Sequence, residues 1–272
     1  MPQQQTEHPS AVNVDLEKLV SIAEAAGRAI LEIYQKDFDV QHKDDQSPLT
    51  EADLAAHRLI VAELEKLQPK LPVLSEESAS IDYEERRRWL RYWLVDPLDG
   101  TREFVKRNGE FTVNIALIES GQARCGVVHV PVAGVTYFGC AGEGAFRRNS
   151  DGSTNSISVS HQRKHPLRIA GSRSHAGDSL QRFLDKVGPH EIVSMGSSLK
   201  LCLVAEGHAD IYPRLGPTSE WDTAAAQAVV EAAGGKVTGL DMKPLKYNTK
   251  DSLLNPHFLV FGDDREDWSS YL

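Results

Sequence analysis

The sequence predicts a mixed α/β protein built in two halves, and three patterns along its 272 residues indicate this. Two amphipathic helices come first, a run of short β-strands follows, and strands then alternate with helices to the end of the chain. The first two patterns predict an α+β half over residues 1–160, and the third predicts an α/β half over residues 161–272. A cleft between the halves is the expected place for a small ligand.

The opening helices are predicted from apolar residues at helical spacing. Residues 14–37 place apolar side chains on one face: Leu16, Leu19, Val20, Ala23, Gly27, Ile30, Leu31 and Tyr34. A second helix is expected near a Thr50–Asp53 pair that resembles a capping box, and it should end before Pro69. Both helices are expected to cover one face of a sheet.

Short runs of β type follow, with Gly, Pro and Asn between them. The expected strands cover residues 71–74, 92–95, 111–118, 123–130 and 134–140. Apolar and polar residues alternate in the third run, which is typical of a strand in an antiparallel meander. Residues 147–164 are rich in Ser, Asn and Arg and are expected to form a surface excursion.

The C-terminal half alternates strands with helices, as a βαβ unit does. The expected strands are residues 167–170, 191–194 and 210–212, and the expected helices are residues 179–187, 198–206 and 219–233. The last helix should begin at a second capping-box pair, Ser219 and Asp222, and end at Gly234 and Gly235.

Charge and composition exclude several classes of partner. The net charge is −9, so the chain lacks the basic stripe that a nucleic-acid polymer or an anionic lipid surface would require. No run of about 18 apolar residues occurs and the N-terminal residues are polar, which predicts neither a transmembrane segment nor a secretory signal. The three cysteines are expected to be reduced and packed, in a cytoplasmic protein. Contact with the cytoplasmic face of the inner membrane stays open.

Five carboxylates lie at expected loops and helix starts: Asp53, Glu76, Asp96, Asp99 and Asp222. A predicted strand ends in Asp96 and Asp99, held by a Pro and a Gly, so this turn can aim two carboxylates and a main-chain carbonyl at one point. Such oxygen ligands suit Mg²⁺, and the spacing does not match a calcium-binding EF-hand loop. Taken singly, each residue could instead cap a helix, lie in an exposed acidic loop or form a turn.

Three segments, residues 74–78, 93–101 and 220–225, resemble the signature segments of the inositol monophosphatase superfamily. The resemblance implies an αβαβα sandwich and a lithium-sensitive phosphatase with two or three Mg²⁺ ions. It implies a set of metal ligands: Glu76, Asp96, the carbonyl of Leu98, Asp99 and Asp222. Asp53, assisted by Thr101, would activate the attacking water beside Glu76.

The superfamily motifs leave inositol phosphates, fructose 1,6-bisphosphate and nucleotide bisphosphates open as substrates. Residues 171–175, 196–200 and 212–218 resemble segments of the bisphosphate nucleotidase branch, which implies hydrolysis of adenosine 3',5'-bisphosphate to AMP in support of sulfate assimilation. The 3'-phosphorylated sulfate donor is a second candidate substrate.

Specific residues are expected to contact this nucleotide. Lys200 and Ser197, at a helix start, could hold its second phosphate, and His175 could contact the nucleoside. The remaining expected substrate contacts are Glu76, Leu98, Asp99, Gly100, Thr101, Ser172 and Asp222. A nucleotide sensor without turnover is a further alternative, but it would not need the water-activating pair Asp53 and Thr101. A third alternative is that the protein is an interaction scaffold, which only the unassigned residues 147–164 would support.

Overall fold

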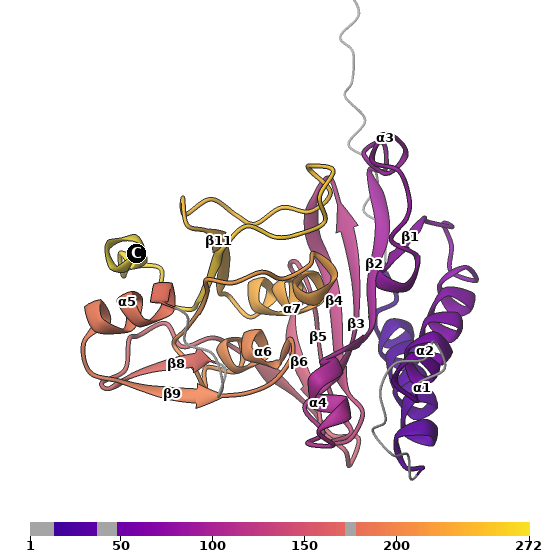
Figure 1. The fold of residues 1–272 in the computed structure, drawn as a ribbon, viewed down its shortest axis with the longest axis horizontal. Helices are drawn as coiled ribbons and strands as arrows, with labels where there is room; N and C mark the ends of the chain where they lie inside the picture. Colours follow the sequence, from indigo (N-terminus) through magenta and orange to yellow (C-terminus); the bar gives the residue numbers. More distant parts are fainter. Residues whose placement is uncertain (1–13, 37–47, 172–177) are drawn as a thin grey trace, which may run out of the picture.

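Five layers of secondary structure make up the protein (Figure 1), which a computed structural model describes for residues 14–36, 48–171 and 178–272. From right to left in Figure 1, a helical layer, a sheet, a second helical layer, a second sheet and a last helix follow one another. The layers contain, in this order, α1 (Leu16–Tyr34) with α2 (Pro48–Leu64), a seven-stranded sheet, α6 (Leu199–Ala205) with α7 (Trp221–Ala232), a five-stranded sheet, and α5 (Asp178–Val187). The predicted αβαβα order is confirmed.

The seven-stranded sheet contains the five strands of the predicted meander in chain order and extends them by two strands that were not predicted. Only β1 and β2 are parallel, and every other neighbouring pair is antiparallel. The strands are β1 (Val73–Ser75), β2 (Arg91–Asp99), β3 (Thr112–Glu119), β4 (Gln122–Val130), β5 (Val135–Cys140), β6 (Gly144–Arg148) and β7 (Thr154–Ile157).

The predicted surface excursion over residues 147–164 is wrong in its first part. The end of β6 and all of β7 fall there, and they extend the sheet as an antiparallel pair. Most side chains of β7 are exposed, so this edge strand shows no apolar alternation that a sequence pattern could reveal.

The five-stranded sheet contains the predicted βαβ unit. Strand β8 is parallel to both β9 and β10, and α5 connects β8 to β9. Two strands that the sequence did not predict, β11 and β12, complete the sheet in antiparallel pairing. The strands are β8 (Leu167–Gly171), β9 (His190–Ser194), β10 (Ile211–Arg214), β11 (Lys236–Gly239) and β12 (Phe258–Phe261).

The helix starts confirm one capping prediction in part and contradict another. Helix α2 begins at Pro48, so Thr50 lies inside the helix and the Thr50–Asp53 capping box is wrong. Proline is favoured at a first helical position because its missing N–H has no partner to lose there. At the start of α7, Asp222 Oδ2 accepts from the Ser219 N–H at 2.9 Å, which is one half of the predicted box.

Four short helical segments complete the described secondary structure: η1 (Glu76–Ser78), α3 (Tyr83–Arg86), α4 (Thr101–Val105) and η2 (Trp268–Tyr271). Among the helices of the described ranges, none has the length and apolar character that crossing a bilayer requires.

Apolar side chains fill the space between successive layers. One cluster joins α1 and α2 to the first sheet, one joins both sheets to α6 and α7, and one joins the second sheet to α5 and η2. Helix α7 lies directly on β4 at Gly126, where an added Cβ would clash with the carbonyl oxygen of Ala225. This close approach brings the first turn of α7 to the sheet that carries Asp96 and Asp99.

Two cysteines differ from the prediction of reduced thiols. Cys125 and Cys140 stand opposite each other on β4 and β5, with Cα atoms 4.1 Å apart, and form a disulfide. Cys202 is a buried free thiol, as predicted. The prediction was wrong for the pair because the number and spacing of cysteines do not reveal strand register, and it is the register that brings these two together.

Candidate metal centre and adjoining pocket

Three carboxylates converge where β2 ends and α7 begins. Asp96, Asp99 and Asp222 each offer an oxygen, and these oxygens lie within 4.8 Å of one another. Residues three apart on a regular strand face opposite sides of the sheet. The pairing of β2 with β3 becomes irregular between Asp96 and Asp99, and the Leu98 N–H donates to Asp96 Oδ1 at 3.0 Å. This turn allows both carboxylates to face Asp222.

Two further carboxylates stand close to these three. Glu76 is exposed in η1, directly after β1, with Asp96 and Asp99 among its neighbours. Asp53 is half-buried on α2, where Glu77 and Glu76 are its charged neighbours. The negative charges of Glu76 and Asp53 both act on Asp96, together with those of Asp99 and Asp222. The structure therefore brings all five of these carboxylates around one point.

Burial and mutual repulsion disfavour the ionised form of this cluster. Burial and neighbouring Glu77 and Glu76 raise the pKa of Asp53 to about 8. Burial is also the main cause that raises the pKa of Asp99 to about 7, with Asp222 next, and the pKa of Asp222 to about 6. The pKa of fully buried Asp96 is raised well above its ordinary value, again chiefly by burial.

A cation fits this cluster on two grounds. A bound divalent cation would favour the ionised carboxylates and reverse the local electrostatics. In addition, Asp53 Oδ1 is buried and has no hydrogen-bond partner among the residues that the structure describes. The donor set is made of carboxylate oxygens, which hard cations such as Mg²⁺ prefer.

A pocket of about 190 Å³ adjoins the cluster. Asp99 and Asp222 form part of its wall, and Lys200 and Arg214 line it as well. Lys200 is only 7% exposed, and its Nζ donates to the carbonyl oxygens of Met195 at 3.2 Å and Ser197 at 2.7 Å. Burial lowers the pKa of Lys200.

Arg214 is a charged pocket residue to which the sequence assigned no role. Its Nη2 donates to the Pro217 carbonyl at 2.6 Å, and its buried Nε has no partner within the described ranges. The pKa of Asp222, raised by burial, is partly lowered again by the charge of Arg214. The available signal was a basic residue directly after a predicted strand, in the 212–218 segment.

The other candidate residues lie around this pocket. Gly100 has a φ of 102° and precedes the exposed Thr101 at the start of α4. Ser197 has a φ of 41°, and its Oγ accepts from Thr112 Oγ1 at 3.3 Å. The side chain of Leu98 is buried in the cluster that faces α1 and α2, so only its main chain could serve the site.

The two remaining sequence candidates cannot be placed. Ser172 and His175 lie outside the residues that the structure describes.

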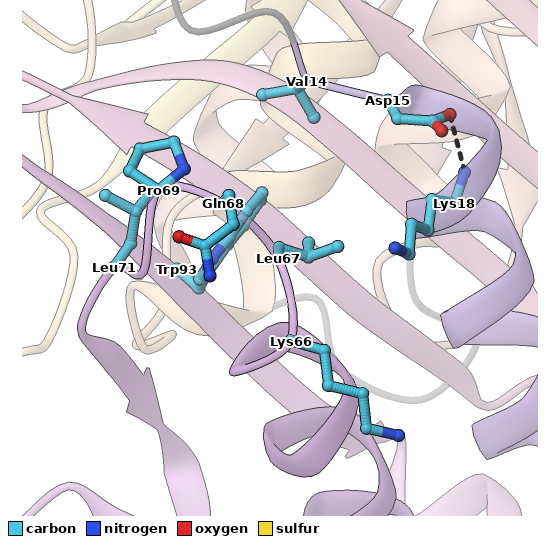
Figure 2. Close-up of a pocket in the computed structure, with 9 residues that line it drawn as sticks. All are labelled: Val14, Asp15, Lys18, Lys66, Leu67, Gln68, Pro69, Leu71 and Trp93. Atoms are coloured by element: carbon cyan, nitrogen blue, oxygen red, sulfur yellow. Dashed lines mark hydrogen bonds between the residues drawn. The ribbon is translucent and has the colours of Figure 1, made fainter.

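A second pocket, of about 280 Å³, lies between the start of α1 and the end of α2 and does not share these features (Figure 2). Lys18, Lys66 and Trp93 contribute to its wall. Its one carboxylate, Asp15, accepts from the Lys18 N–H at 3.1 Å and caps α1. Among the described residues that line it, this pocket has a single carboxylate, already used as a cap, and so no cluster for a metal ion.

The chain is similar in sequence to several known proteins. It is 50% identical over 247 residues to the 3'(2'),5'-bisphosphate nucleotidase CysQ of Salmonella typhimurium, covering 90% of this chain and 98% of that protein. It is 39% identical over 256 residues to the protein of the same name from Haemophilus influenzae, covering 94% and 95%.

Solved structures have the same fold. The crystal structure of CysQ from Bacteroides thetaiotaomicron, a bacterial member of the inositol monophosphatase family, has a TM-score of 0.82 and 41% identity over 91% of this chain and 96% of that one. An inositol monophosphatase from Zymomonas mobilis has a TM-score of 0.76 and 25% identity over 96% and 98%. The inositol monophosphatase family itself matches residues 13–262. This match covers most of the chain, and the chain covers 98% of a relative to which it is 50% identical. The chain therefore belongs to the inositol monophosphatase family.

Proposed function

We propose that this protein is a Mg²⁺-dependent phosphatase that removes the 3'-phosphate of adenosine 3',5'-bisphosphate, giving AMP and phosphate. The observation that carries the proposal is one pocket whose lining combines two unlike sets of charges. We call the carboxylate cluster, of which Asp99 and Asp222 line the pocket, the acidic wall, and Lys200 with Arg214 the basic wall. A substrate with two phosphates could use both walls at once. The bisphosphate nucleotidase relatives support this substrate class.

The metal ligands we propose are those of the carboxylate cluster. Asp96, Asp99 and Asp222 have converging oxygens, and Glu76 and the carbonyl of Leu98 would complete the set. Bound Mg²⁺ supplies positive charge that neutralises the phosphate oxygens and polarises the phosphorus centre. Without it, five carboxylates would repel a phosphate ester. Lithium should inhibit by competing for the same oxygen ligands.

The protein's own contribution to hydrolysis is to orient water and to move a proton. We assign Asp53 as the group that accepts a proton from the attacking water, with Thr101 orienting that water beside Glu76. Asp53 is suited to this role because its Oδ1 has no other hydrogen bond in the described part of the chain. The phosphoryl group transfers in line, so positioning and charge supply most of the catalysis.

The basic wall would hold the phosphate that is not cleaved. Lys200 donates to two main-chain carbonyls, and an ammonium group has three donors, so one remains for a phosphate oxygen. Arg214 adds a guanidinium on the same pocket, and Ser197 adds a hydroxyl. Contacts of Ser172 and His175 with the nucleoside stay predictions, as does activity on the 3'-phosphorylated sulfate donor.

Two broader expectations also stay predictions: that residues 1–160 and 161–272 act as two halves around a cleft, and that the protein works in the cytoplasm. Contact with the inner membrane stays open. The Cys125–Cys140 disulfide removes the argument for the cytoplasm that rested on reduced cysteines.

The test is phosphate release from three substrates in parallel: adenosine 3',5'-bisphosphate, inositol 1-phosphate and fructose 1,6-bisphosphate. Each is assayed with Mg²⁺, with Mg²⁺ plus Li⁺, and with a chelator. We expect strong preference for the nucleotide, loss with Li⁺, and no turnover with the chelator. Preference for either sugar phosphate would agree with the proposed metal chemistry but would overturn the proposed substrate. Binding of the nucleotide without turnover would favour a nucleotide sensor.

A further inference from the structure

A buried arginine lies near the metal centre but takes no part in the proposed chemistry. Arg86, at the end of α3, is 2% exposed. Its Nη1 donates to Asn248 Oδ1 at 2.6 Å and to the Lys250 carbonyl at 3.2 Å, and its Nη2 donates to the Asp251 carbonyl. A buried charge needs such partners, since a buried charge without them strongly destabilises the folded state.

Asn248 returns this contact and extends it. Its Nδ2 donates to the Arg86 carbonyl at 2.6 Å, so the two residues bond in both directions. Its main-chain N–H donates to Glu220 Oε2 at 2.8 Å, and Glu220 is 1% exposed. Arg86, Asn248 and Glu220 thus form one buried polar network, which we call the clasp.

The clasp joins the two segments that carry metal ligands from different parts of the chain. Arg86 lies ten residues after Glu76, at the end of the connection between η1 and β2. Glu220 is the residue before α7, two positions from Asp222. In Figure 1, the segment after β11 runs over α7 toward the end of the sheet where α3 lies. Asn248 belongs to that segment and bonds to both sides.

We propose that the clasp is a positioning device that fixes the Glu76 segment relative to Asp222, and so sets the affinity of the metal centre; this inference rests on the proposed function. Metal ligands must be held to within about 0.5 Å, which requires support from residues behind them. Glu76 is exposed in a short 3-10 turn, so its position depends on the segments that follow it. Clasp residues touch no substrate and are not catalytic.

The test compares divalent cation binding in matched variants of the full-length protein. Arg86→Gln removes the charge and most of the bonds, whereas Arg87→Gln alters the neighbouring exposed arginine, which pairs only with exposed Glu84 among the ion pairs seen in the structure. Asn248→Gly removes both side-chain bonds but keeps the main-chain donor to Glu220. Asn248 has a φ of 55°, which glycine adopts without strain, so this variant should fold even if Arg86→Gln does not.

Binding is measured directly, from the fraction of free Mn²⁺ by electron paramagnetic resonance, with a thermal melt of the metal-free protein beside it. Loss of a residue that supports metal ligands typically lowers metal affinity about 10–100-fold. We expect a loss of that size in Arg86→Gln, about tenfold in Asn248→Gly, and none in Arg87→Gln. At saturating metal, the KM for the nucleotide should be unchanged, because the basic wall is intact.

Two failures are distinguishable. If the wild-type protein binds no Mn²⁺, the proposed function itself is overturned. If the wild type binds Mn²⁺ and Asn248→Gly binds it equally well while melting at a lower temperature, the network is merely structural and the clasp is overturned alone.

Discussion

Burial shifts the pKa values of the residues on the two walls of the pocket in opposite directions. Burial is the main factor that raises the pKa values of Asp99 and Asp222 on the acidic wall, and it is the main factor that lowers the pKa of Lys200 on the basic wall. In each case the buried environment disfavours the charged form. Each wall therefore gains most from a ligand of opposite charge: cations on one side, a phosphate on the other.

The two walls differ in how many hydrogen bonds each charged group already makes within the protein. Lys200 donates to two main-chain carbonyls, and Arg214 donates to one. The five carboxylates of the acidic wall share three main-chain donors in the described residues: Leu98 N–H to Asp96, Ser198 N–H to Asp99 and Ser219 N–H to Asp222. Asp53 Oδ1 has no partner there. The acidic wall thus depends more on its ligand, and changes there should have the larger effects.

Asp99→Asn should have the largest effect and most directly tests whether the acidic wall depends on a bound metal ion. The change removes the negative charge of a proposed metal ligand, but the amide oxygen can still accept from the Ser198 N–H. Because loss of a supporting residue alone costs about 10–100-fold, we expect the loss of a ligand to lower kcat/KM more than about 100-fold. The measurement is phosphate release from adenosine 3',5'-bisphosphate over a Mg²⁺ series.

Asp241→Asn is the matched control, because Asp241 is exposed and its ion pair is with exposed Lys243. Normal turnover in Asp99→Asn would remove Asp99 from the metal centre.

A second change separates proton transfer from metal binding on the same wall. Asp53→Asn should lower kcat by about 10²–10⁴, which is the usual contribution of a general base. Mn²⁺ affinity should fall much less than in Asp99→Asn, since Asp53 is not one of the three carboxylates with converging oxygens. Glu51→Gln, an exposed change on the same helix, is the control. Equal losses of affinity in both aspartate variants would make Asp53 a metal ligand instead.

The same contrast explains what the sequence could predict. The carboxylates of the acidic wall could be predicted because most of them lie in short signature segments of a few residues each. The long helices and the meander could be predicted because they show clear apolar periodicity. The edge strand β7 was missed because its side chains are mostly exposed. Strand β12 is an apolar run as long as the strands predicted at 71–74 and 167–170, so its pattern could have predicted it.

Features that depend on distant contacts were not predictable from local patterns. Arg86 and Asn248 are 162 positions apart, and nothing near either residue indicates their pairing. Cys125 and Cys140 form a disulfide because of strand register, which a cysteine count does not give. Arg214 was visible only as a basic residue in a quoted segment, because its role depends on the pocket that β10 and α7 form together.

A smaller effect is expected from the basic wall. Lys200→Met should raise the KM for adenosine 3',5'-bisphosphate by about tenfold or more, since a hydrogen bond to a charged group contributes about 1.5–3 kcal/mol. The KM for inositol 1-phosphate, which has no second phosphate, should change little. Lys236→Met, at an exposed lysine paired with Asp264, is the control. An equal rise for both substrates would show that Lys200 supports the pocket rather than the second phosphate.

The smallest expected effect is a pH dependence of stability to which the acidic wall contributes most. Buried Glu220, whose pKa burial raises to about 7, adds to it in the same direction. The pKa values of Asp53, Asp99 and Asp222 lie at about 8, about 7 and about 6 in the folded protein, against an ordinary value of 3.8. Between these limits the folded state binds more protons than the unfolded state, so the metal-free protein should lose stability as pH rises from 4 to 8. Added Mg²⁺ should therefore raise the Tm more at pH 8 than at pH 6.

Thermal melts with chelator or with Mg²⁺ at several pH values measure this, and Asp53→Asn sharpens it. Removing the carboxyl with the highest pKa of the three should make the loss of metal-free stability shallower near pH 8. A metal-free Tm that stays constant or rises between pH 6 and pH 8 in the wild type, with no change in slope in Asp53→Asn, would contradict the raised pKa values. In that case the acidic wall would be stabilised internally, as the basic wall is, and the difference between the two walls would disappear.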